Sequence, residues 1–121
     1  MATILIADDN PTIQRIISHT LRRAGHEIIT AYDGLEALDI LEQHTIELGI
    51  FDIAMPEMDG LTLLQTVRKS PEYAALPVVM LTASGQDEDR VQAETLGADG
   101  FLTKPTSSRE ILDLVEQLLA D

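Results

Sequence analysis

Short apolar runs alternate with amphipathic segments along the whole chain. The apolar runs cover residues 4–7, 28–31, 48–51, 78–81 and 101–102. The first, third and fourth runs show no alternation of polar and apolar residues, which is typical of strands buried on both faces of a parallel sheet. The pattern therefore predicts five strands, each followed by a helix.

The segments after these runs carry helix signals. Residues 11–24 have apolar side chains at helical spacing, with Asn10 placed to cap the helix, Pro11 in its first turn and Gly25 at its end. Three later helices begin with capping residues, namely Asp33 with Glu36, Asp59, and Ser107 with Glu110. The weakest helical pattern starts at Gln86 and ends at Gly97.

Five strands alternating with five helices predict one doubly wound α/β domain over residues 1–121. Right-handed crossovers leave few topologies, and the flavodoxin-like order 2-1-3-4-5 for a five-stranded parallel sheet is favoured. In that order, a ligand binds beyond the carboxyl ends of strands 1 and 3, where the winding reverses.

The charge balance is strongly acidic and limits the classes of partner. The 121 residues carry a net charge of −13, so we expect neither nucleic acid nor an anionic membrane as a partner. Cysteine is absent, and no apolar run approaches the roughly 20 residues of a membrane span. With no signal-peptide pattern at the start, a cytoplasmic location is the simplest prediction. The basic residues of the first helix, Arg15, Arg22 and Arg23, mark the expected docking site for an acidic partner.

Charged and hydroxyl side chains stand at the predicted strand ends. Strand 1 ends in Asp8 and Asp9, strand 3 in Asp52, strand 4 in Thr82 and strand 5 in Lys104. Carboxylates suit Mg²⁺, which prefers oxygen ligands and keeps several waters. Asp9 and Asp52 are candidate ligands and Asp8 a candidate partner of a coordinated water, while Lys104 and Thr82 suit the oxygens of a phosphoryl group.

Each of these residues also has an ordinary interpretation when taken alone. Adjacent acids after a strand are usually a solvated turn, and a threonine usually bonds to backbone. Phe101 is most economically a buried strand residue, and the three histidines, His19, His26 and His44, are interpreted as surface residues. Four strand ends with complementary groups at one edge are hard to obtain by chance, which favours a site.

Four blocks of sequence resemble a known family. They are "ILIADDN" at residues 4–10, "FDIAMPEMDG" at 51–60, "PVVMLTAS" at 77–84 and "GADGFLTKP" at 97–105. In this order they resemble the receiver domain of bacterial two-component response regulators, including single-domain members such as the chemotaxis regulator. The resemblance covers essentially the whole chain.

The resemblance implies a role for each residue at the strand ends. Asp52 would accept a phosphoryl group from a kinase phosphohistidine, and Lys104 would pair with that group. Mg²⁺ would be held by Asp8, Asp9, Asp52 and the backbone carbonyl of Ala54. The backbone at Ala54 and Ala83 would also contact the phosphoryl group. The family further implies a cis bond between Lys104 and Pro105.

A conformational switch and its partners are also implied by the resemblance. Thr82 would move toward the phosphoryl group and Phe101 would turn inward, changing the surface formed by helix 4, strand 5 and helix 5. A downstream protein would bind that surface, while a histidine kinase or a histidine phosphotransfer protein would dock on helix 1. The chain would thus be a phosphoacceptor regulator rather than an enzyme, and the alternative role is a phosphorelay intermediate.

The chain departs from the family pattern at several positions. Gly49 is unusual within a strand, Ala54 is smaller than the polar residue often present, and Phe101 replaces a common tyrosine. Gly100 and Thr106 differ from receivers that dimerise through the helix 4–strand 5–helix 5 surface, so we expect a monomer.

Three other classes compete with the receiver interpretation. A Mg²⁺-dependent phosphatase of the haloacid dehalogenase type needs a second acid two residues after its nucleophile, where this chain has Ala54. A nucleotide or flavin binder needs a neutral phosphate loop after strand 1, where this chain has "ADDNPT". A degenerate receiver that only binds partners would not need the complete set of acids, Thr82 and Lys104.

Overall fold

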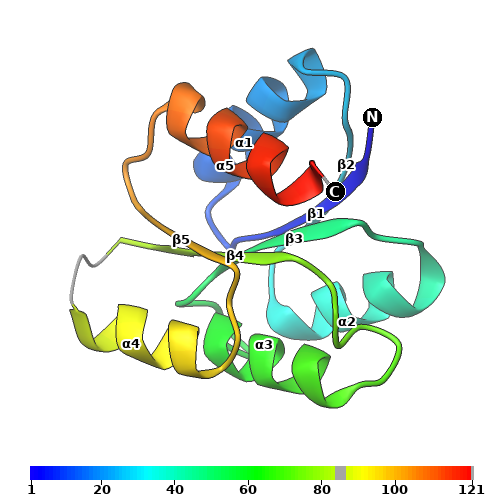
Figure 1. Ribbon diagram of the computed structural model, residues 1–121, viewed down its shortest axis with the longest axis vertical. Coiled ribbons are helices and arrows are strands. Elements are labelled where there is room, and N and C mark those ends of the chain that lie inside the picture. The colour runs from blue at the N-terminus through cyan, green and yellow to red at the C-terminus, as the bar shows by residue number, and fades with distance from the viewer. Residues whose placement is uncertain (84–86, 121) are drawn as a thin grey trace.

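The architecture of the computed structural model is a five-stranded sheet between two layers of helices (Figure 1). The structure describes residues 1–83 and 87–120. In chain order the elements are β1 (Thr3–Ala7), α1 (Pro11–Arg23), β2 (Glu27–Ala31), α2 (Gly34–Gln43), β3 (Leu48–Asp52), α3 (Gly60–Lys69), β4 (Val78–Thr82), α4 (Asp87–Thr95), β5 (Gly100–Thr103) and α5 (Ser108–Leu119). None of the helices in the described part of the chain has the length and apolar character of a membrane span.

The sheet has the predicted topology. All four strand pairings are parallel, and the order is β2-β1-β3-β4-β5. Figure 1 shows α1 and α5 on one face of the sheet and α2, α3 and α4 on the other. The interior strands β3 and β4 are buried at every residue, whereas the edge strands β2 and β5 are partly exposed. The continuous apolar runs therefore indicated the buried strands correctly.

Alternating side chains of each strand pack into two separate hydrophobic cores, one on each face of the sheet. In β1, Ile4 and Ile6 pack in the cluster that includes α1 and α5, whereas Leu5 and Ala7 pack in the cluster on the opposite face. The glycine in β3 also has a packing reason. A Cβ at Gly49 would lie 2.7 Å from the ring of Phe51, two residues along on the same face.

Most predicted helix starts are confirmed. The side chain of Asn10 accepts hydrogen bonds from the first turn of α1, and Ser107 with Glu110 forms a complete capping box on α5. At α2, Glu36 accepts instead from the backbone amide of Tyr32, one residue before the Asp33 cap. The helix α4 is described from Asp87 onward, and the predicted start at Gln86 lies outside the described residues.

One histidine assignment was wrong. His19 and His44 are exposed, but His26 is only 8% exposed. The backbone amide of Ala2 donates to His26 Nδ1 at 3.1 Å, and His26 Nε2 lies 3.3 Å from a carboxylate oxygen of Glu116. Both partners are far away in the sequence, so the helical pattern of residues 11–24 contained no sign of this burial.

Gly60 closes the loop that follows β3. Its amide donates to the Ile53 carbonyl at 2.8 Å, and a Cβ at this position would overlap the carbonyl oxygen of Asp52. The start of α3 therefore packs directly on the end of β3.

We expect Gly60→Ala to destabilise the protein by about 1–3 kcal/mol, because the new methyl group must displace backbone. Alanine would ordinarily stabilise a helix by about 1 kcal/mol relative to glycine, so the sign itself is diagnostic. Urea unfolding should be compared with Gln65→Ala on the exposed face of the same helix, which we expect to change stability by less than about 0.5 kcal/mol. A stabilised Gly60→Ala protein would contradict the close packing.

Candidate functional site

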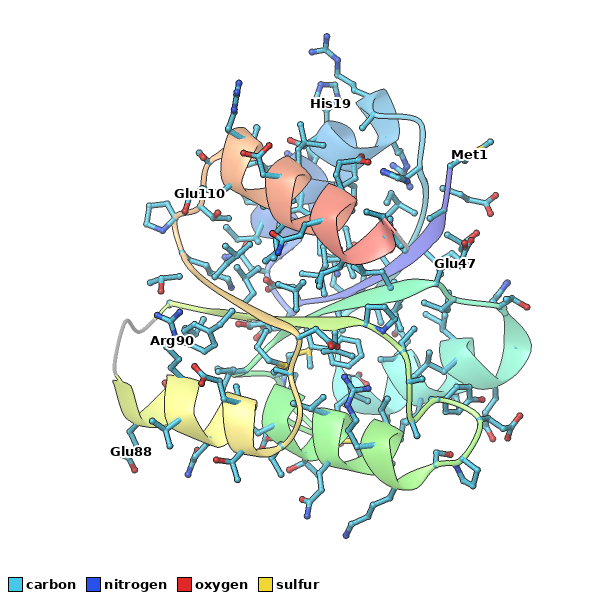
Figure 2. The ribbon with its side chains drawn as sticks, viewed as in Figure 1. Met1, His19, Glu47, Glu88, Arg90 and Glu110 are labelled. Carbon is cyan, nitrogen blue, oxygen red and sulfur yellow. The ribbon has the colours of Figure 1, made fainter. Side chains whose placement is uncertain are left out.

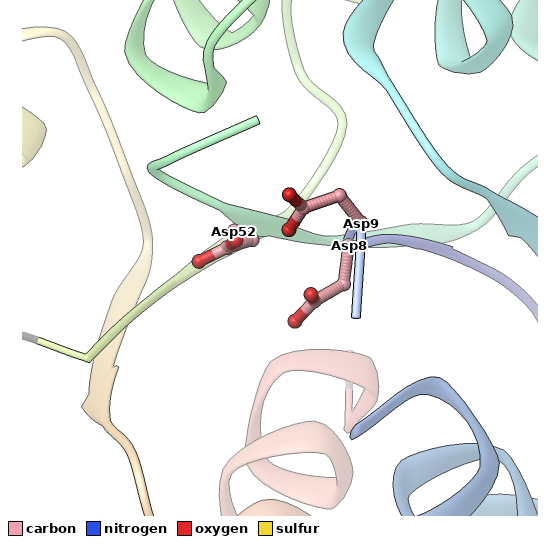
Figure 3. A group of neighbouring side chains, drawn as sticks. All are labelled: Asp8, Asp9 and Asp52. Atoms are coloured by element: carbon pink, nitrogen blue, oxygen red, sulfur yellow. The ribbon is translucent and has the colours of Figure 1, made fainter. Parts of the chain in front are cut away.

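The sheet gathers three acids at the carboxyl ends of β1 and β3. Asp8 and Asp9 follow β1, and Asp52 is the last residue of β3. One carboxylate oxygen from each lies within 4.8 Å of the others, and Figure 3 shows the three side chains together. The topological rule used on the sequence therefore placed these residues correctly.

Backbone contacts fix Asp8 where β1 ends. Asp8 is fully buried, and its amide donates to the Ala31 carbonyl of β2 at 3.0 Å. Its Oδ1 accepts the backbone amide of Asn10 at 2.9 Å, which joins the carboxylate to the start of α1. Asp9 is exposed to solvent. The pair thus presents one fixed, buried carboxylate and one at the surface.

Asp52 is held from both sides in the middle of the sheet. It is 4% exposed, and the next residue, Ile53, donates its amide to the Leu81 carbonyl of β4 at 2.9 Å. On the other side, Gly60 packs against the Asp52 carbonyl. The backbone that carries the carboxylate is therefore fixed at the end of β3.

Lys104 supplies the positive charge. Its Nζ lies 2.9 Å from Asp8 Oδ2 and 3.3 Å from Asp52 Oδ1. Its amide donates to the Thr82 carbonyl at the end of β4. The Lys104–Pro105 bond is cis, as the resemblance implied.

The charges at this edge do not balance. The pKa of Asp52 is raised to about 6, first by burial and second by the charge of Asp8, while Lys104 opposes both effects. Burial alone would lower the pKa of Lys104, but its hydrogen bond to Asp8 and the charge of Asp52 outweigh burial, so that pKa is raised. Three acids face one ammonium group, which leaves an excess of negative charge.

This donor set fits a hard divalent cation. Mg²⁺ takes one or two carboxylates, backbone carbonyls and waters, all of them oxygen ligands. A cation would relieve the repulsion that raises the pKa of Asp52. The combination of buried Asp8, exposed Asp9 and central Asp52 leaves the acids open to solvent on the Asp9 side.

The predicted switch residues lie on adjacent strands. Thr82 is 5% exposed at the end of β4, and Phe101 of β5 is half-buried and pairs with Met80 in register. Thr82 lies two residues after Met80, so Thr82 and Phe101 share one face of the sheet. Arg90 projects from α4 toward the sheet (Figure 2), and its guanidinium carbon lies 5.7 Å from the centre of the Phe101 ring on β5.

Two supporting residues were missed from the sequence. Asn10 was identified only as a helix cap, yet its amide also binds the Asp8 carboxylate. Gln14 was not noticed, although it is buried and its amide group lies 3.1 Å from the Asp8 carbonyl. The available signal was a polar residue at a core position of α1, alongside Ile17 and Leu21.

The fold and this acidic edge define an α/β protein whose site suits a divalent cation and a phosphoryl group. Residues 4–116 match the family model of the response regulator receiver domain, and the chain belongs to that family, the receiver domains of two-component systems.

Individual relatives support the same assignment. The chain is 40% identical to the DNA-binding dual master transcriptional regulator RpaA of a Synechocystis species, over 98% of this chain and 49% of that relative. It thus spans about half the length of this and other curated relatives. The chemotaxis protein CheY4 of Vibrio cholerae has a TM-score of 0.93 and 35% identity, covering 98% of this chain and 99% of that one.

A third comparison concerns the cation. The receiver domain of the sensor histidine kinase PA1611 from Pseudomonas aeruginosa has a TM-score of 0.91 and 25% identity, covering 99% of this chain and 98% of that one. That structure has a magnesium ion coordinated in its active site cleft.

We expect Asp52→Asn to stabilise the metal-free protein at pH 7.5 by about 1–2 kcal/mol. The pKa of Asp52 is raised to about 6 in the folded protein from an ordinary 3.8, so the folded state binds a proton that the unfolded state has released between these values. The native carboxylate therefore destabilises the fold as pH rises through this window. The gain from asparagine should shrink toward zero at pH 4.

Urea unfolding in a chelator at both pH values measures this difference. Asp39→Asn, an exposed position of α2, makes the same change in charge and is the matched control. An equal gain at pH 4 and pH 7.5 would show that ionisation of Asp52 is not its cause.

Proposed function

We propose that this receiver domain is a phosphoryl-accepting switch in which Asp52 is the acceptor. The observation that carries the proposal is the position of Asp52, buried at a strand end with two further acids within 4.8 Å and Lys104 Nζ at 3.3 Å. A carboxylate oxygen of Asp52 would attack the phosphorus of a phosphohistidine. The phosphorus–nitrogen bond would break as the acyl phosphate forms, and the histidine would leave.

The acids would hold Mg²⁺ during this transfer. Its ligands would come from Asp8, Asp9, Asp52 and the backbone carbonyl of Ala54, and the bound cation would neutralise charge on the phosphoryl group. Lys104 would shift from its carboxylate partners toward a phosphoryl oxygen. Ala54 and Ala83 are exposed beside the strand ends, which supports contacts from their backbone. The magnesium ion in the related PA1611 domain supports the same assignment.

Occupation of Asp52 would change the surface of α4, β5 and α5. The added phosphoryl charge would draw the Thr82 hydroxyl inward and open space for Phe101 on the same face of the sheet. This movement would take the ring away from Arg90, so the cation–π contact would be lost. A downstream protein would recognise the changed surface. We further propose a monomer in the cytoplasm that acts as a regulator rather than an enzyme, over the whole of residues 1–121.

The phosphate donor would dock on α1. Arg15 and Arg23 are exposed on this helix, and Arg23 lines a groove of about 340 Å³ between α1 and α5. The rest of the protein is strongly acidic, so these arginines offer the best complement to an acidic surface. The donor would be a sensor histidine kinase or, if the domain is a phosphorelay intermediate, a histidine phosphotransfer protein.

Acetyl phosphate labelling tests the acceptor directly. We expect Mg²⁺-dependent incorporation of one phosphoryl group per chain, mapped to Asp52 by mass spectrometry after chemical trapping. Asp52→Asn should abolish labelling, and Asp39→Asn should leave it unchanged. Labelling at another residue, or equal labelling of Asp52→Asn, would contradict the proposal.

Charge reversal on α1 tests the docking surface. We expect Arg15→Glu with Arg23→Glu to slow transfer from the cognate phosphohistidine by about tenfold or more at low salt, because steering is lost. Arg22 is left intact because its guanidinium donates to the Ile28 carbonyl of β2. Labelling by acetyl phosphate should hardly change, since that donor needs no docking surface.

Lys69→Glu is a control for a single charge reversal away from α1, because Lys69 is exposed on α3, across the sheet from α1. Lys69→Glu should change the rate of phosphoryl transfer from neither the phosphohistidine donor nor acetyl phosphate. Equal slowing by the α1 variant with both donors would indicate damage to the site or the fold instead of lost docking.

A further inference from the structure

One polar side chain is buried in the core-facing side of α1. Gln14 is 2% exposed and shares this side with Ile17, Ser18 and Leu21. Burying an amide costs free energy unless it forms hydrogen bonds. The hydrogen-bond partners of the Gln14 side chain therefore indicate why a glutamine is present at this position.

The amide nitrogen of Gln14 reaches three backbone carbonyls. It lies 3.0 Å from Ile6 O, 3.1 Å from Asp8 O and 2.6 Å from Ala31 O. An amide group has only two hydrogens, so at least one is shared between acceptors. All three acceptors lie at the carboxyl ends of β1 and β2, and none belongs to α1 itself.

These contacts complete the restraint on Asp8. The Ala31 carbonyl accepts hydrogen bonds from both the Asp8 amide and the Gln14 side chain. Gln14 therefore helps to hold the carbonyl that anchors the Asp8 backbone. The Asp8 carbonyl is held by Gln14, and the Asp8 carboxylate accepts from Asn10. The amide, the carbonyl and Oδ1 of Asp8 thus each have a partner that resists displacement.

A restraint on the Asp8 backbone opposes the repulsion between like charges at this site. The Asp8 and Asp52 carboxylates repel each other, and within residues 1–83 and 87–120 Lys104 is the one cation that bridges them. A free Asp8 would relieve the repulsion by turning away from Asp52, which would separate the ligands. Residues that hold metal ligands in place commonly change metal affinity by about 10–100-fold when they are removed.

We propose that Gln14 is a positioning residue of the metal site, which fixes Asp8 against the repulsion of Asp52. The inference rests on the proposed function, in which Asp8 helps to hold Mg²⁺. Gln14 does not touch the cation or the phosphoryl group. It acts through the backbone of Asp8, and it joins the first turns of α1 to the ends of both strands.

A purely structural role is the competing explanation. In that case, Gln14 would only seal the edge between β1 and β2, and its loss would lower stability without changing the site. The two explanations differ in the native protein, where a structural role leaves Mg²⁺ affinity unchanged.

The decisive variant is Gln14→Met, which keeps the length and most of the volume but has no donor. Gln14→Asn keeps the amide but is one methylene shorter, and it serves as the milder variant if Gln14→Met folds poorly. Ser18→Ala is the matched control on the same buried side, since Ser18 Oγ has no hydrogen-bond partner among the described residues. Ile17→Val provides a loss of stability from core packing alone.

Two readouts separate the explanations. The first is amide hydrogen exchange at Asp8 and Asn10 in metal-free protein, followed by nuclear magnetic resonance. The second is Mg²⁺ affinity from the amide shifts of Asp8, Asp9 and Asp52. For Gln14→Met we expect about tenfold weaker Mg²⁺ binding and faster exchange at both amides than the change in global stability explains. Gln14→Asn should change both readouts in the same direction.

The control variants should bind Mg²⁺ as the wild type does, and Ile17→Val should alter exchange only through global stability. Unchanged Mg²⁺ affinity in both Gln14 variants, with lower stability, would overturn the positioning role while leaving the proposed function intact. A wild-type protein that shows no Mg²⁺-dependent shifts at the three acids would instead overturn the proposed function, and with it the positioning role.

Discussion

The repulsion among three carboxylates at one edge of the sheet is the constraint around which this domain is arranged. Parallel strands bring their carboxyl ends to the same edge, so acids that are distant in sequence become neighbours. Asp8 and Asp52 are buried there, and the ammonium group of Lys104 lies between them. An arrangement with unbalanced charge persists only where the surrounding structure fixes each member. The backbone contacts of these residues supply that fixation.

The same imbalance provides the chemical capacity of the site. A cluster with balanced charges would not attract a cation. Here three carboxylates face one ammonium group, and the excess negative charge attracts a cation. Burial, and after it the charge of Asp8, raises the pKa of Asp52, so its ionised form is costly at this edge. Lys104 is shared between two acids, and in the proposed function it would move from them to the phosphoryl group. The repulsion lowers the stability of the folded protein at this edge of the sheet. Binding of a cation together with a phosphoryl group would restore that stability.

The sequence predicted the parts of the structure that repeat or that follow from topology. Continuous apolar runs indicated the interior strands, and the strand order placed Asp8, Asp9 and Asp52 together without any pairwise signal between them. The missed features all depend on particular side-chain contacts, some of them between distant residues, that the pattern of apolar and polar positions does not encode. The burial of His26 depends on Ala2 and Glu116, and the glycine in β3 is explained only by the ring of Phe51. Gln14 was missed because a single polar residue on a helix carries no signal of its partners.

Helix α1 connects the outside of the protein to the acids. Its outer face carries Arg15 and Arg23, proposed to meet the phosphate donor, while its inner face carries Gln14 against the Asp8 backbone. Its first residue follows Asn10, whose amide binds the Asp8 carboxylate. A partner that tilts α1 would therefore displace Asp8, a proposed metal ligand, through the hydrogen bonds that Asn10 and Gln14 make to it. Small displacements suffice, because phosphoryl transfer depends on alignment of the donor, the acceptor and the cation. Docking and chemistry would then be linked by one helix, so that a correctly seated donor would also improve the site that receives its phosphoryl group.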